Sequence, residues 1–418
     1  MFPAPSPSGI LESPAGNPLN AKARYRAVRE RTAARCAPLC VEDHVVQPAE
    51  FVSPPKWHLA HTTWFFEQFI LKNRPGYHLF SAEMAGLFNS YYETVGVRVP
   101  RADRGKMTRP TLEEVQDYRR HVDEAMAAFL AEGSASEAQL SALELGLNHE
   151  EQHQELLITD IKYILGRNPL FPAYGDFPEG VAEPSEGAFI PIEGGLYAIG
   201  AGGAGFNFDN ERDRHQVFLN PYAISDRLVT NGEYMAFMAD GGYRDFRHWH
   251  ADGWQWVKDH GVEAPLYWHR TGEAWHHYTL QGLRPVDPAL PVCHISFYEA
   301  FAFAAWKGMR LPTEAEWEVA SSRFPWGQRW EWTHSAYLPY PGFRQGPGAL
   351  GEYNGKFMVN QLVLRGASVA TAVGHSRSTY RNFFQPELRW QYAGVRLAKD
   401  RADAAQVVPH SETEAHRR

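Results

Sequence analysis

The chain has 418 residues, of which 44% are hydrophobic and 13% aromatic, and its formal net charge is -8. A chain of this length exceeds the size that one hydrophobic core usually reaches, so two folded domains are expected. The acidic balance gives no electrostatic reason to expect nucleic acid or an anionic membrane as a partner, which favours small-molecule chemistry.

The start of the chain and its cysteines are typical of a cytoplasmic protein. The first residues lack the basic and then apolar pattern of a secretory signal, and no apolar run is long enough to span a membrane. Cys36, Cys40 and Cys293 are too few and too scattered for a disulfide framework, so we expect free thiols.

Four helices are predicted after a flexible tail over residues 1–18, which is rich in Pro, Ser and Gly. Thr111 and Ser136 are each followed three residues later by Glu or Gln, a capping pattern that opens a helix. Gly133 and Gly166 mark the ends of these two helices. Long helices joined by loops favour an up-and-down bundle. The four predicted helices cover residues 19–40, 57–72, 111–132 and 136–166.

The second half of the chain has a different texture. Residues 167–187 are dense in Pro, Gly and acidic residues and are predicted to form a linker. Residues 188–400 alternate short apolar segments with turn residues, which predicts a loop-rich domain with modest strand content and helices near 298–307 and 313–321. Residues 401–418 are polar, and disorder is expected there. The expected fold class is therefore α+β.

Two histidines, His149 and His153, lie four residues apart in the fourth predicted helix. Positions four apart lie on one helix face, so both imidazoles can bind the same ion. The run His149-Glu150-Glu151-Gln152-His153 also matches the zinc-protease pattern, in which Glu150 would activate a water molecule. The residues after His153 do not supply the further ligand of that class, so a zinc hydrolase is the weaker hypothesis.

A third ligand is expected from the second helix, where His58 and His61 stand among aromatic and apolar residues. Spacing does not choose between these two, and buried histidines with a purely structural role explain the pattern about equally well. Three neutral imidazoles without a carboxylate suit zinc or non-haem Fe(II), and both metals leave positions open for other ligands.

The aromatic-rich stretch between the second and third helices supplies further polar candidates. A phenol near the metal, from Tyr91 or Tyr92, could exchange a proton with a substrate. Arg98, Arg101 and Arg104 could clamp a carboxylate, although exposed arginines of this kind are often only solvated.

Taken together, these motifs resemble the ergothioneine-pathway sulfoxide synthases. Those enzymes join a DinB-like helical bundle to a domain of the formylglycine-generating-enzyme fold, a C-type-lectin-like structure. The resemblance covers residues 20–398 and implies a DinB-like four-helix bundle over 19–166 and the loop-rich domain over 188–400. The segments that carry it are Trp57-His58-Leu59-Ala60-His61, His149-x3-His153-x-Glu155 and Arg310-Leu311-Pro312-Thr313-Glu314-Ala315-Glu316-Trp317-Glu318.

The resemblance implies an Fe(II) enzyme that uses dioxygen to couple cysteine or γ-glutamylcysteine to the imidazole C2 of hercynine, giving a sulfoxide. It implies His61, His149 and His153 as the iron ligands. A close branch, the selenoneine synthases, joins hercynine to a seleno-sugar. That branch is the alternative here. The loop after Val95 carries Val97 and Val99 where relatives tend to be more polar, and a less polar donor pocket would favour a donor other than cysteine or γ-glutamylcysteine.

The resemblance also implies contacts to the two substrates. Asn89-Ser90-Tyr91-Tyr92-Glu93 is similar to the branch whose active-site tyrosine comes from the helical domain, so Tyr91 or Tyr92 would be the proton donor. Glu155 points away from the ligand face of its helix, and we expect a structural or supporting role for it. The implied contacts are Gln152 to the hercynine imidazole, Asn382 to its carboxylate, Phe383 and Phe384 to its trimethylammonium group, and Arg98 and Arg101 to the carboxylates of the sulfur donor.

One departure from related sequences disfavours an activity of the same fold. Formylglycine-generating enzymes use a cysteine pair near the C-terminal end, and this chain has no cysteine after Cys293. That activity is therefore disfavoured. A non-catalytic protein, with a lectin-like domain that recognises a ligand and a bundle that holds a structural metal, is a more remote alternative.

Overall fold

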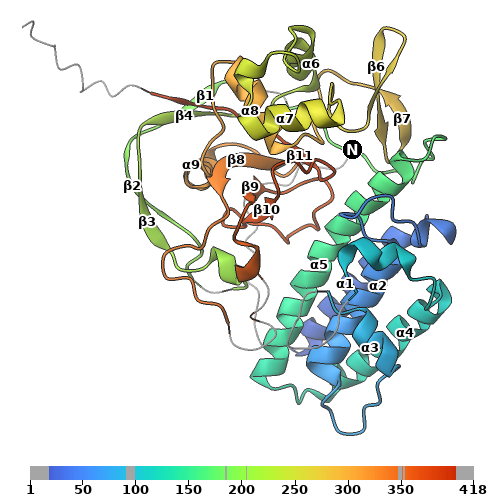
Figure 1. The fold of residues 1–418 in the computed structure, drawn as a ribbon. Coiled ribbons are helices and arrows are strands. Elements are labelled where there is room, and N and C mark those ends of the chain that lie inside the picture. The colour runs from blue at the N-terminus through green and yellow to red at the C-terminus, as the bar shows by residue number, and fades with distance from the viewer. Residues whose placement is uncertain are drawn as a thin grey trace, which may run out of the picture.

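The computed structural model describes residues 18–90, 99–183, 186–203, 205–346, 351 and 354–401. Its first part is helical, and its second part is rich in strands and loops, which confirms the expected α+β class (Figure 1). The predicted tails lie outside the described residues, apart from Pro18 and Arg401. No helix among the described residues is long and apolar enough to cross a membrane.

Four long helices pack against one another in the helical part (Figure 1). Both predicted capping boxes are present, at Thr111 and at Ser136, and Gly133 ends its helix in the left-handed conformation with φ 66°. The predicted bundle is therefore confirmed. Its helices are α1 (Pro18–Cys36), α2 (Pro55–Phe66), α4 (Leu112–Glu132) and α5 (Glu137–Gly166), and the short helix α3 (Ala82–Leu87) lies between α2 and α4.

The second helix differs from its predicted form. All twelve residues of α2 are buried, as its aromatic sequence predicts, but the α-helix ends at Phe66 and continues as a π-helical segment, Glu67–Leu71. The buried Glu67 carboxylate accepts hydrogen bonds from the hydroxyls of Tyr118 and Tyr77 at 2.6 and 2.8 Å. These two bonds satisfy the buried charge where the helix changes its winding.

Among its described residues, the second part contains four small sheets. A four-stranded sheet has the order β10-β9-β8-β11, two three-stranded sheets have the orders β1-β4-β12 and β5-β6-β7, and β2 pairs with β3. The strands are β1 (Phe189–Ile192), β2 (Gly195–Ile199), β3 (His215–Leu219), β4 (Tyr222–Ser225), β5 (Trp268–Thr271), β6 (Ala274–Thr279), β7 (Gly282–Pro285), β8 (Trp330–Ala336), β9 (Leu362–Gly366), β10 (Asn382–Phe384), β11 (Ala393–Gly394) and β12 (Ala398–Asp400).

Helices cover these sheets, and the two that were predicted are present to within one residue at each end. The helices are α6 (Asn231–Ala239), α7 (Ala251–His260), α8 (Phe297–Trp306) and α9 (Glu314–Ala320).

Helix α5 lies along the boundary between the two parts (Figure 1). The hydrophobic core of the bundle continues across this boundary, because Tyr267, Tyr278 and Tyr392 of the second part belong to the same cluster of buried residues as the bundle helices. The predicted linker packs here as well, since the Tyr174 hydroxyl donates a hydrogen bond to the Arg35 carbonyl at 2.8 Å. Helix α5 therefore contributes side chains to the boundary between the two parts, among them Gln152 and Glu155.

Candidate metal centre

Three histidines of the helical part converge on one point. His61 comes from α2, and His149 and His153 come from adjacent turns of α5. The ε nitrogens of His61 and His149 are 3.2 Å apart, and one ring nitrogen of each histidine lies within 4.8 Å of the others. Two metal–imidazole bonds of about 2.1 Å span about 3.2 Å when the angle between them is about 100°. The triad therefore fits a single bound ion.

Close packing of two helices brings this triad together. A Cβ atom added at Gly146 would lie 2.7 to 2.9 Å from ring atoms of Phe65 and Phe66 on α2. Only glycine permits this approach, and Gly146 lies one turn before His149. The α2–α5 spacing that places His61 opposite His149 thus depends on the missing side chain.

The spacing of the histidines left the choice between His58 and His61 open, and the structure groups His61 with His149 and His153. His61 joins the triad and donates through Nδ1 to the Phe88 carbonyl oxygen at 2.7 Å, which leaves its Nε2 toward the other histidines. The Nδ1 atom of His58 lies 2.9 Å from Nδ1 of His153, and its Nε2 lies 3.0 Å from the Asp160 carboxylate. His58 therefore supports His153 from behind, as partners of metal-binding histidines commonly do.

The imidazoles of the triad are held neutral. Burial lowers the pKa of His149 to about 3 and takes the pKa values of His61 and His153 well below their ordinary value, with a further contribution from the neighbouring histidines. A neutral imidazole offers a lone pair to a metal. Three such donors with no carboxylate among them are compatible with zinc and with Fe(II).

Glu150 lies away from this site, which removes the zinc-protease interpretation. Its carboxylate accepts hydrogen bonds from Thr32, Arg119 and Arg29 at 2.7, 2.8 and 3.0 Å inside the bundle. Burial alone would raise the pKa of Glu150, but Arg29 and Arg119 outweigh it and lower that pKa to about 2. A carboxylate tied up in this way cannot accept a proton from water at the histidines.

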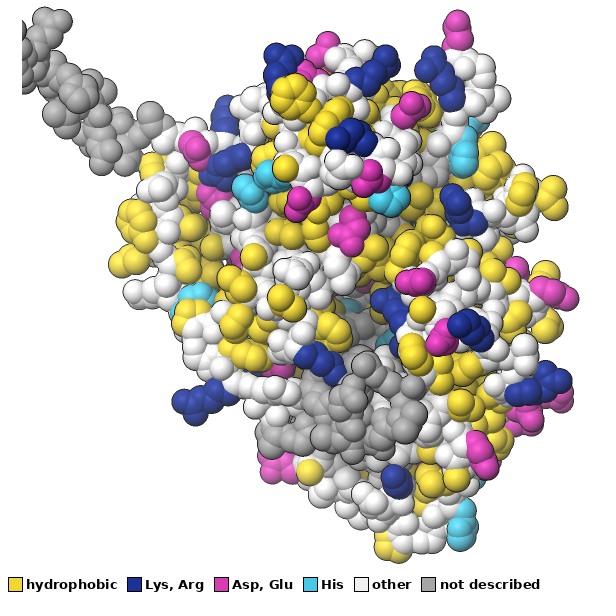
Figure 2. Space-filling model, viewed as in Figure 1, with side chains coloured by type: hydrophobic (Ala, Val, Ile, Leu, Met, Phe, Trp, Pro, Cys, Tyr) yellow, Lys and Arg dark blue, Asp and Glu magenta, His cyan; other side chains and the backbone are white. Residues whose placement is uncertain are grey.

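A cleft of about 370 Å³ opens beside the triad and is lined from both parts of the molecule. Figure 2 shows a hollow between the helical and the strand-rich parts on one face. The cleft brings together His149 and His153 from α5 with five of the predicted substrate contacts. These are Gln152 from α5, Arg101 from the loop before α4, and Asn382, Phe383 and Phe384 from β10.

Partners in the second part hold several of these side chains. The Gln152 amide donates to the Tyr380 hydroxyl at 2.6 Å. The Phe383 ring stacks on Tyr337 with 4.0 Å between ring centroids. The Phe384 ring meets Trp390 edge-on at 5.1 Å. The aromatic wall of the cleft is therefore fixed by packing before any ligand binds.

The excursion between α2 and α4 is described in part. Tyr91, Tyr92 and Arg98 lie outside the described residues. Arg101 is exposed at the cleft, whereas Arg104 is buried and stacks on the Trp57 ring at 3.4 Å. Trp57 in turn stacks on His61, with 4.4 Å between ring centroids.

Arg104 is thus a cleft residue with a fixed position. Its guanidinium donates to the Ser53 and Ser90 hydroxyls at 2.8 and 2.9 Å. The sequence offered Arg104 only as one of three loop arginines. Arg104 and Trp57 are far apart in the sequence, so no local pattern predicts their contact.

Glu155 ties α5 to the second part. Its carboxylate accepts hydrogen bonds from Trp330 Nε1 at 2.5 Å and from the Ser368 and Thr371 hydroxyls at 2.7 Å each. The expected supporting role of Glu155 agrees with this geometry, because its side chain fixes the face of α5 that carries Gln152 against the opposite wall of the cleft.

Comparisons with known proteins cover both parts of the chain. The DinB superfamily matches residues 24–157, and the sulfatase-modifying factor enzyme 1-like domain matches residues 176–329. The hercynine oxygenase of Mycolicibacterium thermoresistibile is 30% identical over 409 residues, which cover 84% of this chain and 88% of that protein. The chain belongs to the hercynine oxygenase family. Its relatives are named as oxygenases, and the family is therefore one of oxidative enzymes.

Other relatives agree with this assignment. The hercynine oxygenase of Mycobacterium tuberculosis is 30% identical over 84% of this chain and 91% of that protein. The formylglycine-generating enzyme of Streptomyces coelicolor is 32% identical, but over only 37% of this chain and 55% of that protein. Similarity to hercynine oxygenases thus extends over both parts, whereas similarity to the formylglycine-generating enzyme is partial.

Proposed function

We propose that this member of the hercynine oxygenase family is a non-haem Fe(II) enzyme that uses dioxygen to join a sulfur donor to the imidazole C2 of hercynine. One C–H bond of hercynine and one S–H bond of the donor break, and a C–S bond forms. One oxygen atom of O2 ends on the sulfur as a sulfoxide, and the other leaves as water with the two hydrogens. Cysteine or γ-glutamylcysteine is the proposed donor.

The observation that carries this proposal is the position of the histidine triad. His61, His149 and His153 would hold the ion, and a set of three protein ligands would leave further coordination positions for other ligands. His149 and His153 line the cleft, so a ligand in the cleft would lie beside the ion. Bound iron would supply the one-electron chemistry that dioxygen needs in order to react with organic molecules. A closed structural site would need a fourth protein ligand, and none is found with the triad among the described residues.

The side chains around the cleft suit hercynine. Gln152 precedes His153 on α5, and its amide can hydrogen-bond an imidazole bound beside the metal. The Phe384 ring offers an aromatic face to a trimethylammonium group. The side-chain oxygen of Asn382 accepts from the Phe383 backbone N–H at 2.9 Å, and its amide nitrogen can donate to the hercynine carboxylate.

Fewer described residues bear on the binding of the sulfur donor. Arg101 and Arg104 both line the cleft and give it positive charge, which favours a donor with carboxylates. Tyr91 or Tyr92 remains the proposed proton donor, and Arg98 a proposed donor contact, from the amino-acid sequence alone. Coupling of a seleno-sugar by the same chemistry remains the alternative, since it needs the same triad and the same hercynine contacts.

Oxygen uptake with a panel of donors tests the proposal. The protein is loaded anaerobically with Fe(II) and given hercynine with cysteine, γ-glutamylcysteine or a seleno-sugar, and the product mass is recorded. We expect hercynine-dependent oxygen consumption with a sulfur donor. Faster turnover with the seleno-sugar would select the alternative. Absence of oxygen uptake with every donor would refute the iron chemistry. Hydrolytic activity of the zinc-loaded protein without oxygen would support a zinc hydrolase instead.

A further inference from the structure

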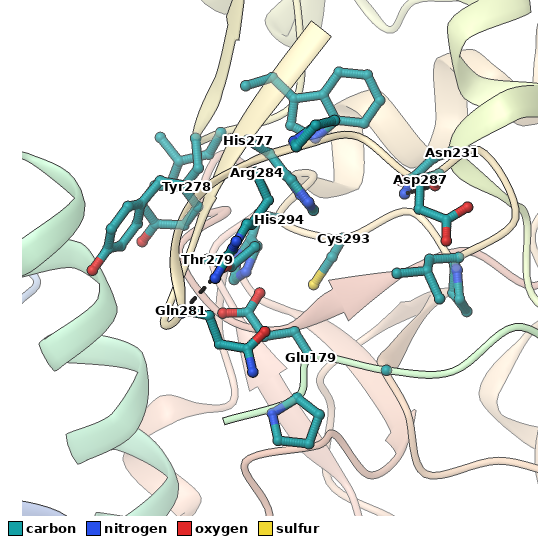
Figure 3. A pocket seen from close by; sticks show the side chains of 18 of the residues that line it. Glu179, Asn231, His277, Tyr278, Thr279, Gln281, Arg284, Asp287, Cys293 and His294 are labelled. Carbon is teal, nitrogen blue, oxygen red and sulfur yellow. Dashed lines mark hydrogen bonds between the residues drawn. The ribbon is translucent and has the colours of Figure 1, made fainter. Parts of the chain in front are cut away.

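A second cavity, of about 220 Å³, lies near the C-terminal end of α5 and shares no lining residue with the cleft. Its walls come from the β5-β6-β7 sheet and from segments around Glu179, Cys293 and Arg329. In Figure 3, His277 enters from the sheet above, Glu179 lies below, and the Cys293 sulfur points into the space between them. A space of this size holds several water molecules or a small organic molecule.

The buried charges around this cavity do not cancel. Lys162 of α5 pairs with the Glu179 carboxylate at 2.5 Å, and its ammonium also donates to His294 Nε2 at 2.8 Å. Arg329 is only 3% exposed, and its guanidinium donates to the carbonyl oxygens of Gln328 and Pro291 at 2.8 and 3.2 Å. Within the described ranges, no carboxylate forms an ion pair with Arg329. One positive charge is left over at the cavity wall.

Two buried hydrogen-bond donors of the lining also lack a protein partner. Arg329 Nε and the Tyr267 hydroxyl make no hydrogen bond to another described residue, and Tyr267 is 5% exposed. Unpaired donors of this kind are uncommon in folded proteins and call for a partner. Both belong to residues that line the same cavity.

The other polar groups of the lining do not supply the missing negative charge. Burial, with a contribution from Lys162, lowers the pKa of His277 to about 4, so this imidazole is neutral at neutral pH. Burial raises the pKa of the Cys293 thiol, which is therefore uncharged as well. Asp287 also lines the cavity, but it is exposed, and its carboxylate accepts from the backbone N–H of Ala289 at 2.9 Å and forms no ion pair with Arg329 among the described residues.

We infer that this cavity is a second ligand site, separate from the metal centre, and that it binds a small organic acid whose carboxylate pairs with Arg329. The carboxylate would accept hydrogen bonds from Arg329 Nε and from the Tyr267 hydroxyl, which pairs both orphaned donors and the unmatched charge in one step. The cavity volume of about 220 Å³ suits a small organic molecule. Its remaining atoms would lie against His277 and Cys293.

Cys293 provides a built-in probe of this inference. Iodoacetate and iodoacetamide alkylate thiols in the same way, since sulfur forms a bond to the CH2 carbon, iodide leaves, and the thiol proton goes to solvent. Only iodoacetate carries a carboxylate. The full-length protein is treated with each reagent, and the rates at Cys293 and Cys40 are followed by peptide mass spectrometry. Cys40 is exposed and serves as the internal control.

We expect the ratio of the iodoacetate rate to the iodoacetamide rate to be at least fivefold higher at Cys293 than at Cys40. Acetate should slow the reaction at Cys293 and leave the reaction at Cys40 unchanged. The preference should be lost in Arg329→Met and kept in Arg329→Lys, with thermal melting used to verify that both variants fold. Equal ratios at the two cysteines, or a reaction at Cys293 that acetate does not slow, would overturn the inference.

Discussion

Two buried side chains, Asp160 and His58, orient the His153 imidazole. Asp160 accepts from the backbone N–H of Ser53 and from Trp390 Nε1 at 2.9 and 2.8 Å, so its carboxylate is fixed before it meets His58. His58 then contacts His153 at 2.9 Å. Supporting partners of this kind commonly contribute a factor of 10 to 100 to metal affinity.

Replacing His58 by phenylalanine keeps a flat ring in place but removes both nitrogens. We expect His58→Phe to weaken Fe(II) binding by about 10- to 100-fold, measured by anaerobic equilibrium titration, with little change in helix content. His78→Phe, at an exposed position, is the control and should leave the affinity unchanged. Equal affinities of wild type and His58→Phe would show that His58 does not orient the ligand.

Glu150 carries a fully buried charge inside the bundle. Its folded-state pKa of about 2 lies below the ordinary value of 4.5, so its ionised form stabilises the fold above about pH 4.5. That contribution, about 3 kcal/mol from the shift, is lost as the pH falls from about 4.5 through 2.

We expect Glu150→Gln to lower stability at pH 7 by about 3 to 5 kcal/mol, because Arg29 and Arg119 lose their buried partner. The variant should also lose less stability than wild type on acidification below pH 4.5, as followed by urea denaturation. Glu30→Gln removes an exposed ion pair with Arg26 and should change stability by less than about 1 kcal/mol. An unchanged acid profile in Glu150→Gln would contradict this role.

At the scale of elements, the helices were the predictable part. The capping residues Thr111 and Ser136 and the terminal Gly133 act within one turn of chain, so their sequence pattern fixes the helix ends. The i, i+4 spacing of His149 and His153 likewise places both on one face. The π-helical turn after Phe66 was not predictable, because the Tyr77 and Tyr118 hydroxyls that satisfy the carboxylate there come from outside the helix.

The approach of α2 to α5 gives a prediction about Gly146. Gly146→Ala should lower stability by about 1 to 3 kcal/mol, since its Cβ would overlap the buried rings of Phe65 and Phe66, and it should weaken Fe(II) binding by separating His61 from His149. Gly86→Ala in α3 is the matched control. Nothing lies within 4 Å of its added Cβ, so thermal stability should stay the same or rise. Wild-type stability and metal affinity in Gly146→Ala would contradict the packing argument.

At the scale of the whole molecule, the cleft exists because α5 presents different faces to the two parts. His149 and His153 face the bundle, whereas Gln152 and Glu155 contact the second part. The partners of Glu155 lie 175 to 216 positions away in the chain, in a strand and in loops. Local patterns cannot predict contacts over such separations, which is why only the resemblance to a family indicated that the cleft has two walls.

Glu155→Gln tests this coupling between the parts. We expect kcat/KM for hercynine to fall at least tenfold, because the hydrogen bonds of Glu155 that hold α5, and with it Gln152, against the second part are weakened. The variant should still bind one Fe(II). Glu137→Gln, an exposed carboxylate in the first turn of the same helix, should behave as wild type. Loss of iron together with activity would instead show that Glu155 acts on the metal centre.

Labelling with ¹⁸O2 tests most directly whether this cleft performs oxidative coupling. The Fe(II)-loaded protein is given hercynine, a sulfur donor and ¹⁸O2 in ordinary water, and the mass of the product is measured by mass spectrometry. We predict a sulfoxide that carries one labelled oxygen atom, and no product from His149→Ala. An unlabelled product, or the same labelled product from His149→Ala, would contradict the assignment of this reaction to the histidine triad.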